Sequence, residues 1–259
     1  MSNIEIIGVS NVGKVRTNNQ DNLYCNGVVK NVEDNTFIYK TTVDANERII
    51  CAIADGMGGL RYGEEAAYYA VCTLKKYIDK KNMDGSAPSI RSAIKHMNKA
   101  VCKLARSKSA VMGSTVTVLK YKDGKMAMYN LGDSKGFLYR DGKLFQMTTD
   151  HTETASMKRM NDMIGGFDEG KAKNTLTQYL GIDEEEFIVE PAVSEVVKIC
   201  ENDVAMLTSD GLTGMVDKET IISILQNYQF SLEEKAKILV EKAIEAGGKD
   251  NISVILVKM

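Results

Sequence analysis

The chain has 259 residues, of which 44% are hydrophobic and 26% are charged, and its formal net charge at pH 7 is −2. These values are typical of a globular protein, and we expect one domain over residues 1–259. Because lysine and arginine form no block, we expect neither nucleic acid nor an anionic membrane as a partner. The odd number of widely spaced cysteines indicates reduced thiols and therefore a cytoplasmic location.

The beginning of the chain gives no targeting signal. Its first residues, MSNIEIIGVS, lack the basic and apolar regions of a secretory signal. No apolar run in the sequence approaches the roughly 20 residues that a membrane-spanning helix needs. We therefore expect no membrane anchor.

Strand patterns dominate the first part of the chain. Residues 4–10 and 23–29 are rich in apolar and β-branched side chains, and a polar segment separates them. A third apolar run, Ile49–Ala54, leads directly into Asp55. These three segments are predicted to be strands.

Helices and hairpins are predicted next. Apolar residues recur every three or four positions over 63–78 and 90–106, which indicates two amphipathic helices. Two hairpins follow, each around an Asp-Gly pair typical of a tight primed turn. We expect the hairpins to continue as one antiparallel meander. Their predicted strands are 115–121 with 125–132, and 136–140 with 143–147.

The last part of the chain returns to strands after an excursion. The polar segment 148–170 is predicted to leave the sheet and to be helical at most. Ser231 and Glu234 have the spacing of a capping box, which predicts the start of a helix. Further strands are predicted at 194–200, 204–210 and 252–259.

The character of the strands predicts the architecture. Continuous apolar strands are buried on both faces, so the sheets should pack on each other and also be covered by helices. We therefore expect a four-layer αββα sandwich of the α+β class, with two antiparallel sheets flanked by helices.

Acidic residues adjoin several of the predicted strands: Asp55, Asp133 and Asp210 each follow an apolar run, and Asp250 precedes one. Carboxylates gathered at one edge of a sheet repel one another unless a cation offsets their charge. With no accompanying histidine or cysteine pattern, oxygen ligands favour Mg²⁺ or Mn²⁺ over zinc or copper. Aspartate also suits turns at strand ends, which explains each residue taken singly. The joint pattern predicts a metal site.

The segment ADGMGG, residues 54–59, places three glycines directly after an acidic residue. Glycine lets the backbone approach a ligand closely, so a carbonyl can turn toward a cation. The segment lacks the Lys-Ser/Thr ending of a nucleotide P-loop and the full dinucleotide fingerprint. The alternative is a flexible turn between a strand and a helix.

Other polar residues are candidates for the same site, although each could instead have only a structural or surface role. Arg16, in GKVRTNNQD, could grip a phosphate with its planar guanidinium, although an isolated arginine is usually a solvated surface residue. The segment 113–115, Gly-Ser-Thr, could donate hydrogen bonds at the site or form only a turn. His151 could be a general acid, a ligand or a structural residue.

Taken in order, these motifs resemble those of the metal-dependent serine/threonine protein phosphatases of the PPM, or type 2C, family in their compact bacterial form. The resemblance runs nearly from end to end. The segments that carry it are GKVRTNNQD, ADGMGG followed by GEEAA, MGSTVTVL, NLGDSKGFLYRDGKLFQMTTDH, LTQYLG, LTSDGLTGMV and GGKDNISVILV.

The resemblance implies a central sandwich with a metal centre at one end and a flap over about residues 148–191. It implies that Asp55 bridges two metal ions and that the carbonyl of Gly56 binds one of them. Asp210 and Asp250 would complete the shell of the other ion. Asp21 would orient metal-bound water.

The resemblance further implies a weaker third ion, held by Asp133 together with Asp210, and Mn²⁺ or Mg²⁺ as the cofactor. Arg16 would bind the phosphate. Many family members have a histidine in or just after the glycine segment, where this chain has Met57 and Leu60, which cannot donate a proton. A metal-bound water or His151 would then protonate the leaving group.

The implied activity is hydrolysis of phosphoserine and phosphothreonine in proteins by a metal-activated water. Expected partners are phosphorylated proteins, including the autophosphorylated form of a serine/threonine kinase of bacterial type, and we expect a monomer. Two alternatives remain at this point. One is a catalytically silent module with the same fold, and the other is a phosphatase dedicated to one regulator in a partner-switching pathway.

Overall fold

The computed structural model describes residues 3–57, 62–81, 87–164, 174–183, 185 and 187–259. Within them the strands form two sheets in which every pairing is antiparallel. The first sheet has the order β10-β9-β13-β14-β1-β4. Its strands are β10 (Lys143–Gln146), β9 (Lys135–Arg140), β13 (Val204–Thr208), β14 (Ile252–Lys258), β1 (Asn3–Asn11) and β4 (Thr36–Asp44).

The second sheet has the order β11-β8-β7-β5-β2-β3, with β12 paired to β8 and β6 paired to β5. Its strands are β11 (Ala192–Val193), β8 (Lys125–Leu131), β7 (Val116–Lys122), β5 (Ile49–Met57), β2 (Asp21–Cys25), β3 (Val28–Val29), β12 (Val197–Lys198) and β6 (Gly113–Ser114). The helices are α1 (Gly63–Lys81), α2 (Ala87–Lys108), α3 (Glu153–Ile164), α4 (Asp210–Thr213), α5 (Lys218–Gln226) and α6 (Leu232–Glu245).

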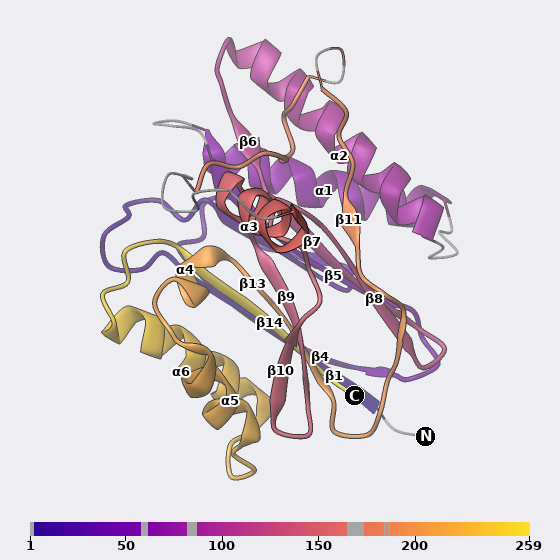
Figure 1. Ribbon diagram of the computed structural model, residues 1–259, viewed down its shortest axis with the longest axis vertical. Coiled ribbons are helices and arrows are strands. Elements are labelled where there is room, and N and C mark those ends of the chain that lie inside the picture. Colours follow the sequence, from indigo (N-terminus) through magenta and orange to yellow (C-terminus); the bar gives the residue numbers. More distant parts are fainter. Residues whose placement is uncertain (1–2, 58–61, 82–86, 165–173, 184, 186) are drawn as a thin grey trace.

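Three buried clusters show how the layers pack. Apolar side chains from the inner faces of both sheets, such as Ile6 and Leu119, form the central cluster. Helices α1 and α2 bury a second cluster against the sheet that contains β5, and α5 and α6 bury a third against the sheet that contains β14. Figure 1 shows the helix pairs on opposite sides of the two sheets. The predicted αββα sandwich is confirmed.

The prediction of one continuous meander was wrong. Both predicted hairpins form, but β7 and β8 belong to one sheet, whereas β9 and β10 belong to the other. The chain crosses between the sheets after Leu131, where Gly132 has a φ of +101° that favours glycine. The Asp-Gly turns were read correctly, because turn chemistry is local, but the partner of each hairpin is decided by long-range packing.

Of the predicted strand over 194–200 only β12 forms, while β11 lies just before this range, and both pair with β8. Between them the hydroxyl of Ser194 accepts a hydrogen bond from the backbone N–H of Met128 at 2.9 Å. A side chain therefore replaces the backbone partner in the ladder, and the strand is interrupted. Strand β4 and helix α5 were not predicted at all.

The described part of the excursion after β10 contains helix α3 and joins neither sheet as a full strand. Isolated bridges pair Thr152 with Leu176 and Ser114 with Leu180, so the segment is fastened to the sandwich at two points. Residues 165–173 of the excursion lie outside the described residues. Among the described helices, none is long and apolar enough to cross a bilayer.

The cysteine side chains are all free thiols. Cys25, Cys51 and Cys102 are buried, Cys72 is partly buried and Cys200 is exposed. This agrees with the expectation of reduced thiols.

Leu74 on α1 tests the packing of the helical layer. Its side chain is 0% exposed and belongs to the same cluster as Ile50 and Val118. We expect Leu74→Ala to lower the free energy of unfolding by about 2–5 kcal/mol, because it leaves a cavity. The control is Ile38→Ala in β4, where the side chain is 55% exposed. Its free energy of unfolding should fall by less than about 1 kcal/mol. Urea unfolding followed by circular dichroism measures both, and equal losses would contradict this packing.

Candidate metal centre

The predicted acidic residues meet at one end of the sandwich because the strands are antiparallel. The start of β2 lies beside the end of β5, so Asp21 pairs directly with Asp55 across the ladder. Side chains at paired positions point to the same face, with their Cβ atoms about 5 Å apart. In the same way the end of β13 meets the start of β14, which brings Asp210 and Asp250 to this end.

The backbone of Asp55 is fixed by the Gly-Ser-Thr segment. Its N–H donates to Thr115 Oγ1 at 3.0 Å, and its carbonyl accepts from the Thr115 N–H at 2.8 Å and from Ser114 Oγ at 3.1 Å. The next residue, Gly56, has no room for a side chain, because an added Cβ would lie 2.0 Å from the carbonyl oxygen of Gly63. The position of the carboxylate is therefore set by tight local packing.

A close backbone contact also sets the approach of Asp210 to Asp250. Asp210 begins α4, and a Cβ on the following Gly211 would lie 2.0 Å from the carbonyl oxygen of Asn251. Asn251 in turn accepts from the Gln20 N–H at 2.8 Å and donates to the Asn18 carbonyl at 3.0 Å. The start of β14 is thereby tied to the segment that precedes Asp21.

Asp21 is the deepest member of the set and is 1% exposed. Ser209 Oγ donates to its Oδ2 at 2.7 Å. Its Oδ1 is the buried side-chain oxygen that has no hydrogen-bond partner among the described residues. Burial raises the pKa of Asp21 to about 7, against the hydrogen bonds that favour its charged form and with the help of the Asp210 and Asp250 charges.

The pKa values of the neighbouring carboxyls Asp55 and Asp133 are also raised. Burial, together with the charges of Asp21, Asp210, Asp250 and Asp133, raises the pKa of Asp55 well above its usual range. Burial and the charge of Asp210 raise the pKa of Asp133 to about 6. Groups of like charge with raised pKa values mark a site that a cation would stabilise.

The chemistry of the site fits divalent metal ions. The donors at this end are carboxylate and carbonyl oxygens, which hard ions such as Mg²⁺ and Mn²⁺ prefer. Oδ1 of Asp21, which has no hydrogen-bond partner in the described part of the chain, is also an acceptor that a cation would satisfy. Among the described residues, no three acidic, histidine or cysteine side chains are already arranged as a metal-binding group. The fit therefore rests on donor type, mutual repulsion and the unpartnered oxygen.

Arg16 lies at the rim of the acidic end. Its Nη2 is 2.8 Å from Oδ2 of Asp250, and the two side chains are 51% and 39% exposed. An exposed ion pair of this kind contributes little stability, which leaves the guanidinium available to another anion.

Asp133 reaches the same end from the turn after β8. The turn is held by a 2.7 Å hydrogen bond between the hydroxyls of Thr115 and Ser134. Lys135 forms an ion pair with Asp150 beside it, and its charge lowers the pKa of Asp133 against the effect of burial.

His151 has structural contacts. Its Nδ1 accepts a hydrogen bond from the Gly132 N–H at 3.2 Å, and its backbone N–H donates to the Gly132 carbonyl at 3.1 Å. Burial lowers the pKa of the ring, so the neutral form is favoured. These contacts fasten the excursion after β10 to the turn that carries Asp133.

The sequence reading missed the polar residues that support the acidic end. Ser10, Ser209 and Ser253 are buried and linked by hydrogen bonds, and Asn19 donates to Ser10 at 2.8 Å. Serines inside otherwise apolar strands are the signal that could have found them, since a buried hydroxyl needs a partner. Asn251 was visible only as a neighbour of Asp250.

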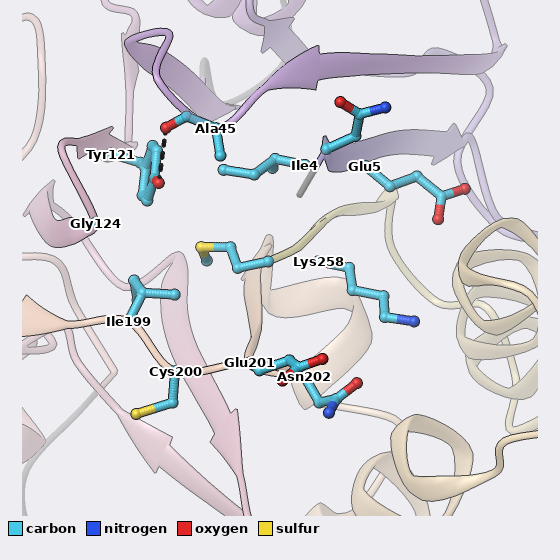
Figure 2. A pocket seen from close by; sticks show the side chains of 12 residues that line it. Ile4, Glu5, Ala45, Tyr121, Gly124, Ile199, Cys200, Glu201, Asn202 and Lys258 are labelled. Atoms are coloured by element: carbon cyan, nitrogen blue, oxygen red, sulfur yellow. Dashed lines mark hydrogen bonds between the residues drawn. The ribbon is translucent and has the colours of Figure 1, made fainter. Parts of the chain in front are cut away.

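A separate hollow of about 650 Å³ lies at the opposite end of the sandwich. It is lined by the start of β1 and the end of β14, and Figure 2 shows Tyr121 donating to the carbonyl of Ala45 there, at 2.9 Å. Glu5 and Glu201 are its acidic side chains. This hollow offers no carboxylate cluster, so its size does not make it the reactive site.

Comparison with known sequences identifies the family. The sequence pattern of protein phosphatase 2C matches residues 22–252, which is most of the chain. The chain belongs to the protein phosphatase 2C family. The resemblance of the motifs is thereby confirmed, and membership makes the chain a metal-dependent protein serine/threonine phosphatase.

Individual relatives of this protein phosphatase 2C member are bacterial. The serine/threonine phosphatase stp of Listeria welshimeri is 32% identical over 254 residues, which cover 95% of this chain and 92% of that protein. The solved serine/threonine phosphatase of S. agalactiae has a TM-score of 0.81 at 25% identity and covers 99% of both chains. The catalytic domain of PstP, solved with 2 manganese ions, has a TM-score of 0.77 at 26% identity and covers 99% of both chains.

The raised pKa of Asp21 makes the stability of the metal-free phosphatase depend on pH. The pKa of Asp21 is about 7 in the folded state, whereas its ordinary value, which applies to the unfolded chain, is 3.8. At a pH between these two values the folded state keeps a proton that the unfolded chain has lost. Raising the pH therefore favours unfolding. In EDTA, we expect the free energy of unfolding of wild type to fall by up to about 4 kcal/mol relative to that of Asp21→Asn as the pH rises from about 4 to 7. Urea unfolding at several pH values measures this, and parallel profiles would contradict it.

Proposed function

We infer that this phosphatase acts at the acidic end of the sandwich, where it removes phosphate from phosphoserine and phosphothreonine in proteins. The observation that supports this location is the meeting of Asp21, Asp55, Asp210 and Asp250 from separate strand ends, with Arg16 paired to Asp250 at the rim. A dense negative centre with a cation at its edge suits a reaction that must hold metal ions and a phosphate ester together.

We propose the metal ligands that the resemblance to the family implies. Asp55 would bridge two ions, and the carbonyl of Gly56 would bind one of them. Asp210 and Asp250 would complete the shell of the other, and Asp133 with Asp210 would hold a weaker third. Mn²⁺ or Mg²⁺ fits a set of oxygen donors, and the PstP catalytic domain with 2 manganese ions supports this choice.

When bound, the ions supply the charge that activates a water molecule for attack on phosphorus, without a covalent enzyme intermediate. Asp21 would orient that water. Its Oδ2 is fixed by Ser209, and its Oδ1 has no hydrogen-bond partner among the described residues. Arg16 would bind the non-bridging phosphate oxygens and favour the redistribution of charge over them.

No side chain is assigned as the proton donor to the leaving group. Met57 has no proton to give, and Leu60 lies outside the described residues. The neutral ring of His151 is committed to Gly132, so we assign it a structural role. Protonation would then come from water in the site.

The expected substrates are phosphorylated proteins, including the autophosphorylated form of a bacterial-type serine/threonine kinase. The bacterial serine/threonine phosphatases among the relatives support this class. The protein would act as a monomer of one domain over residues 1–259 in the cytoplasm, with the 148–191 excursion as a flap beside the site. A silent binding module is not favoured, because the acidic set is complete. No observation favours a phosphatase dedicated to one regulator.

Asp55→Asn tests the metal ligands. It should lower the Mn²⁺-dependent hydrolysis of p-nitrophenyl phosphate at least about a hundredfold, because even residues that only support metal ligands are worth about 10–100-fold. The matched control is Asp217→Asn, on the exposed aspartate that caps α5, which should keep wild-type activity. Circular dichroism checks the fold of both variants. Undiminished activity of Asp55→Asn would refute the assignment.

Arg16→Ala tests phosphate binding. We expect kcat/KM for a phosphothreonine peptide to fall about 10–100-fold, because a charge-assisted contact to the phosphate is lost. The affinity for Mn²⁺, measured by calorimetry, should change by less than about threefold. Arg91→Ala is the control, since Arg91 is also exposed and is also paired with a carboxylate, that of Glu190 at 3.4 Å. Unchanged kinetics in Arg16→Ala would remove this residue from the site.

A further inference from the structure

Lys30, directly after β3, is buried although it carries a charge. Its side chain is 0% exposed, and it is the largest of the fully buried side chains in the described part of the chain. An ammonium group is costly to bury unless hydrogen bonds and opposite charges satisfy it. Its position therefore requires specific partners.

Those partners close the turn between β3 and β4. Nζ of Lys30 donates to the carbonyl of Asp34 at 2.8 Å and to the carbonyl of Asn31 at 3.2 Å. The Asp34 N–H also donates to the Asn31 carbonyl at 3.2 Å. The charges of Asp21 and Asp34 stabilise the ammonium against its burial, so Lys30 lies within electrostatic reach of the acidic end.

The backbone of Lys30 is attached to β2, next to Asp21. Its N–H donates to the Leu23 carbonyl at 3.2 Å, and its carbonyl accepts from Asn22 Nδ2 at 3.1 Å. Asn22 is 1% exposed. The lysine thus joins the strand that begins with Asp21 to the turn that its ammonium holds closed.

The turn continues into Asn35, which holds the segment before Asp21. The Asn35 carbonyl accepts from the Val12 N–H at 2.9 Å and from Asn19 Nδ2 at 3.2 Å. Its Oδ1 accepts from the Asn19 N–H at 3.3 Å, and Asn19 Oδ1 accepts from the Asp21 N–H at 3.2 Å. Hydrogen bonds, joined by the peptide bond between Asp34 and Asn35, therefore link Lys30 to Asp21 and support the 12–20 segment that carries Arg16.

We propose that Lys30 is a positioning residue for phosphate hydrolysis. Its buried ammonium holds the 31–35 turn against Asn19, so that Asp21 and Arg16 keep their places at the acidic end. Lys30 itself contacts neither the substrate nor a metal ion. This inference rests on the roles proposed above for Asp21 and Arg16.

Lys30→Met tests the proposal, because methionine is unbranched and adapts to a buried site while it removes the charge. We expect kcat for a phosphothreonine peptide with Mn²⁺ to fall about tenfold or more, since small misplacements of positioning groups have large effects on rate. Affinity for Mn²⁺ should change by less than about threefold, because the hydrogen bonds of the turn, among the described residues, run to Lys30, Asn19 and Val12 and not to Asp55, Asp210 or Asp250. Hydrogen exchange in residues 12–20, measured by mass spectrometry, should become faster.

Lys235→Met is the matched control. Lys235 Nζ also donates to a backbone carbonyl, that of Leu225 at 2.7 Å, and burial lowers its pKa. It lies in a hollow with Asn202 and Lys258, at the end of the sandwich opposite the acidic end. This variant should lose stability without a change in kcat or in hydrogen exchange of residues 12–20.

A folded Lys30→Met variant with kcat within about twofold of wild type, or with unchanged exchange in residues 12–20, would overturn the proposal. If Lys30→Met does not fold, Asn35→Ala removes an acceptor of Asn19 at an exposed position and should lower kcat and speed the same exchange. Unchanged values there would overturn the proposal as well. If wild type releases no phosphate, the proposed function fails, while the exchange measurement still decides whether Lys30 holds the segment.

Discussion

The acidic end depends on the antiparallel pairing of the strands. Because β2 and β5 run in opposite directions, the first residue of one meets the last part of the other, and Asp21 lies opposite Asp55. The same rule brings Asp210, after β13, to Asp250, before β14. Residues far apart in the chain thus gather as like charges, and their repulsion is what makes the end of the sandwich a place for cations.

Buried polar side chains surround and support this concentration of charge. Ser209 and Asn19 form hydrogen bonds with Asp21, and Asn251 ties the start of β14 to the segment that precedes Asp21. Each of these side chains is buried and has partners, so the network is rigid. Rigidity costs the reaction nothing at the moment of catalysis, because the dipoles and charges are already oriented before the substrate arrives. In our proposal Lys30 adds to this support from further away, through the 31–35 turn and Asn19.

Local patterns predicted the elements better than their assembly. The two long helices, the capping box at Ser231 and both Asp-Gly turns follow from short-range chemistry, and the structure has them. The hairpins were nevertheless placed in one sheet, since nothing near Gly132 in the sequence says which sheet the next strand joins. Helix α5 was missed because Ile221 and its neighbours favour strands, whereas packing against α6 and the sheet makes them helical. Strand β4 was overlooked although its alternating aromatic and β-branched residues gave a usable signal.

The sequence by itself determined the chemistry of this phosphatase: oxygen donors at strand ends, glycines beside them, an arginine nearby and a family pattern along nearly the whole chain. Only the tertiary structure decided that Lys30 is buried and that Oδ1 of Asp21 has no hydrogen-bond partner in the described part of the chain. The physical reason is that residue type and spacing are local properties. Burial and hydrogen bonding arise instead between segments that meet only when both sheets have packed together.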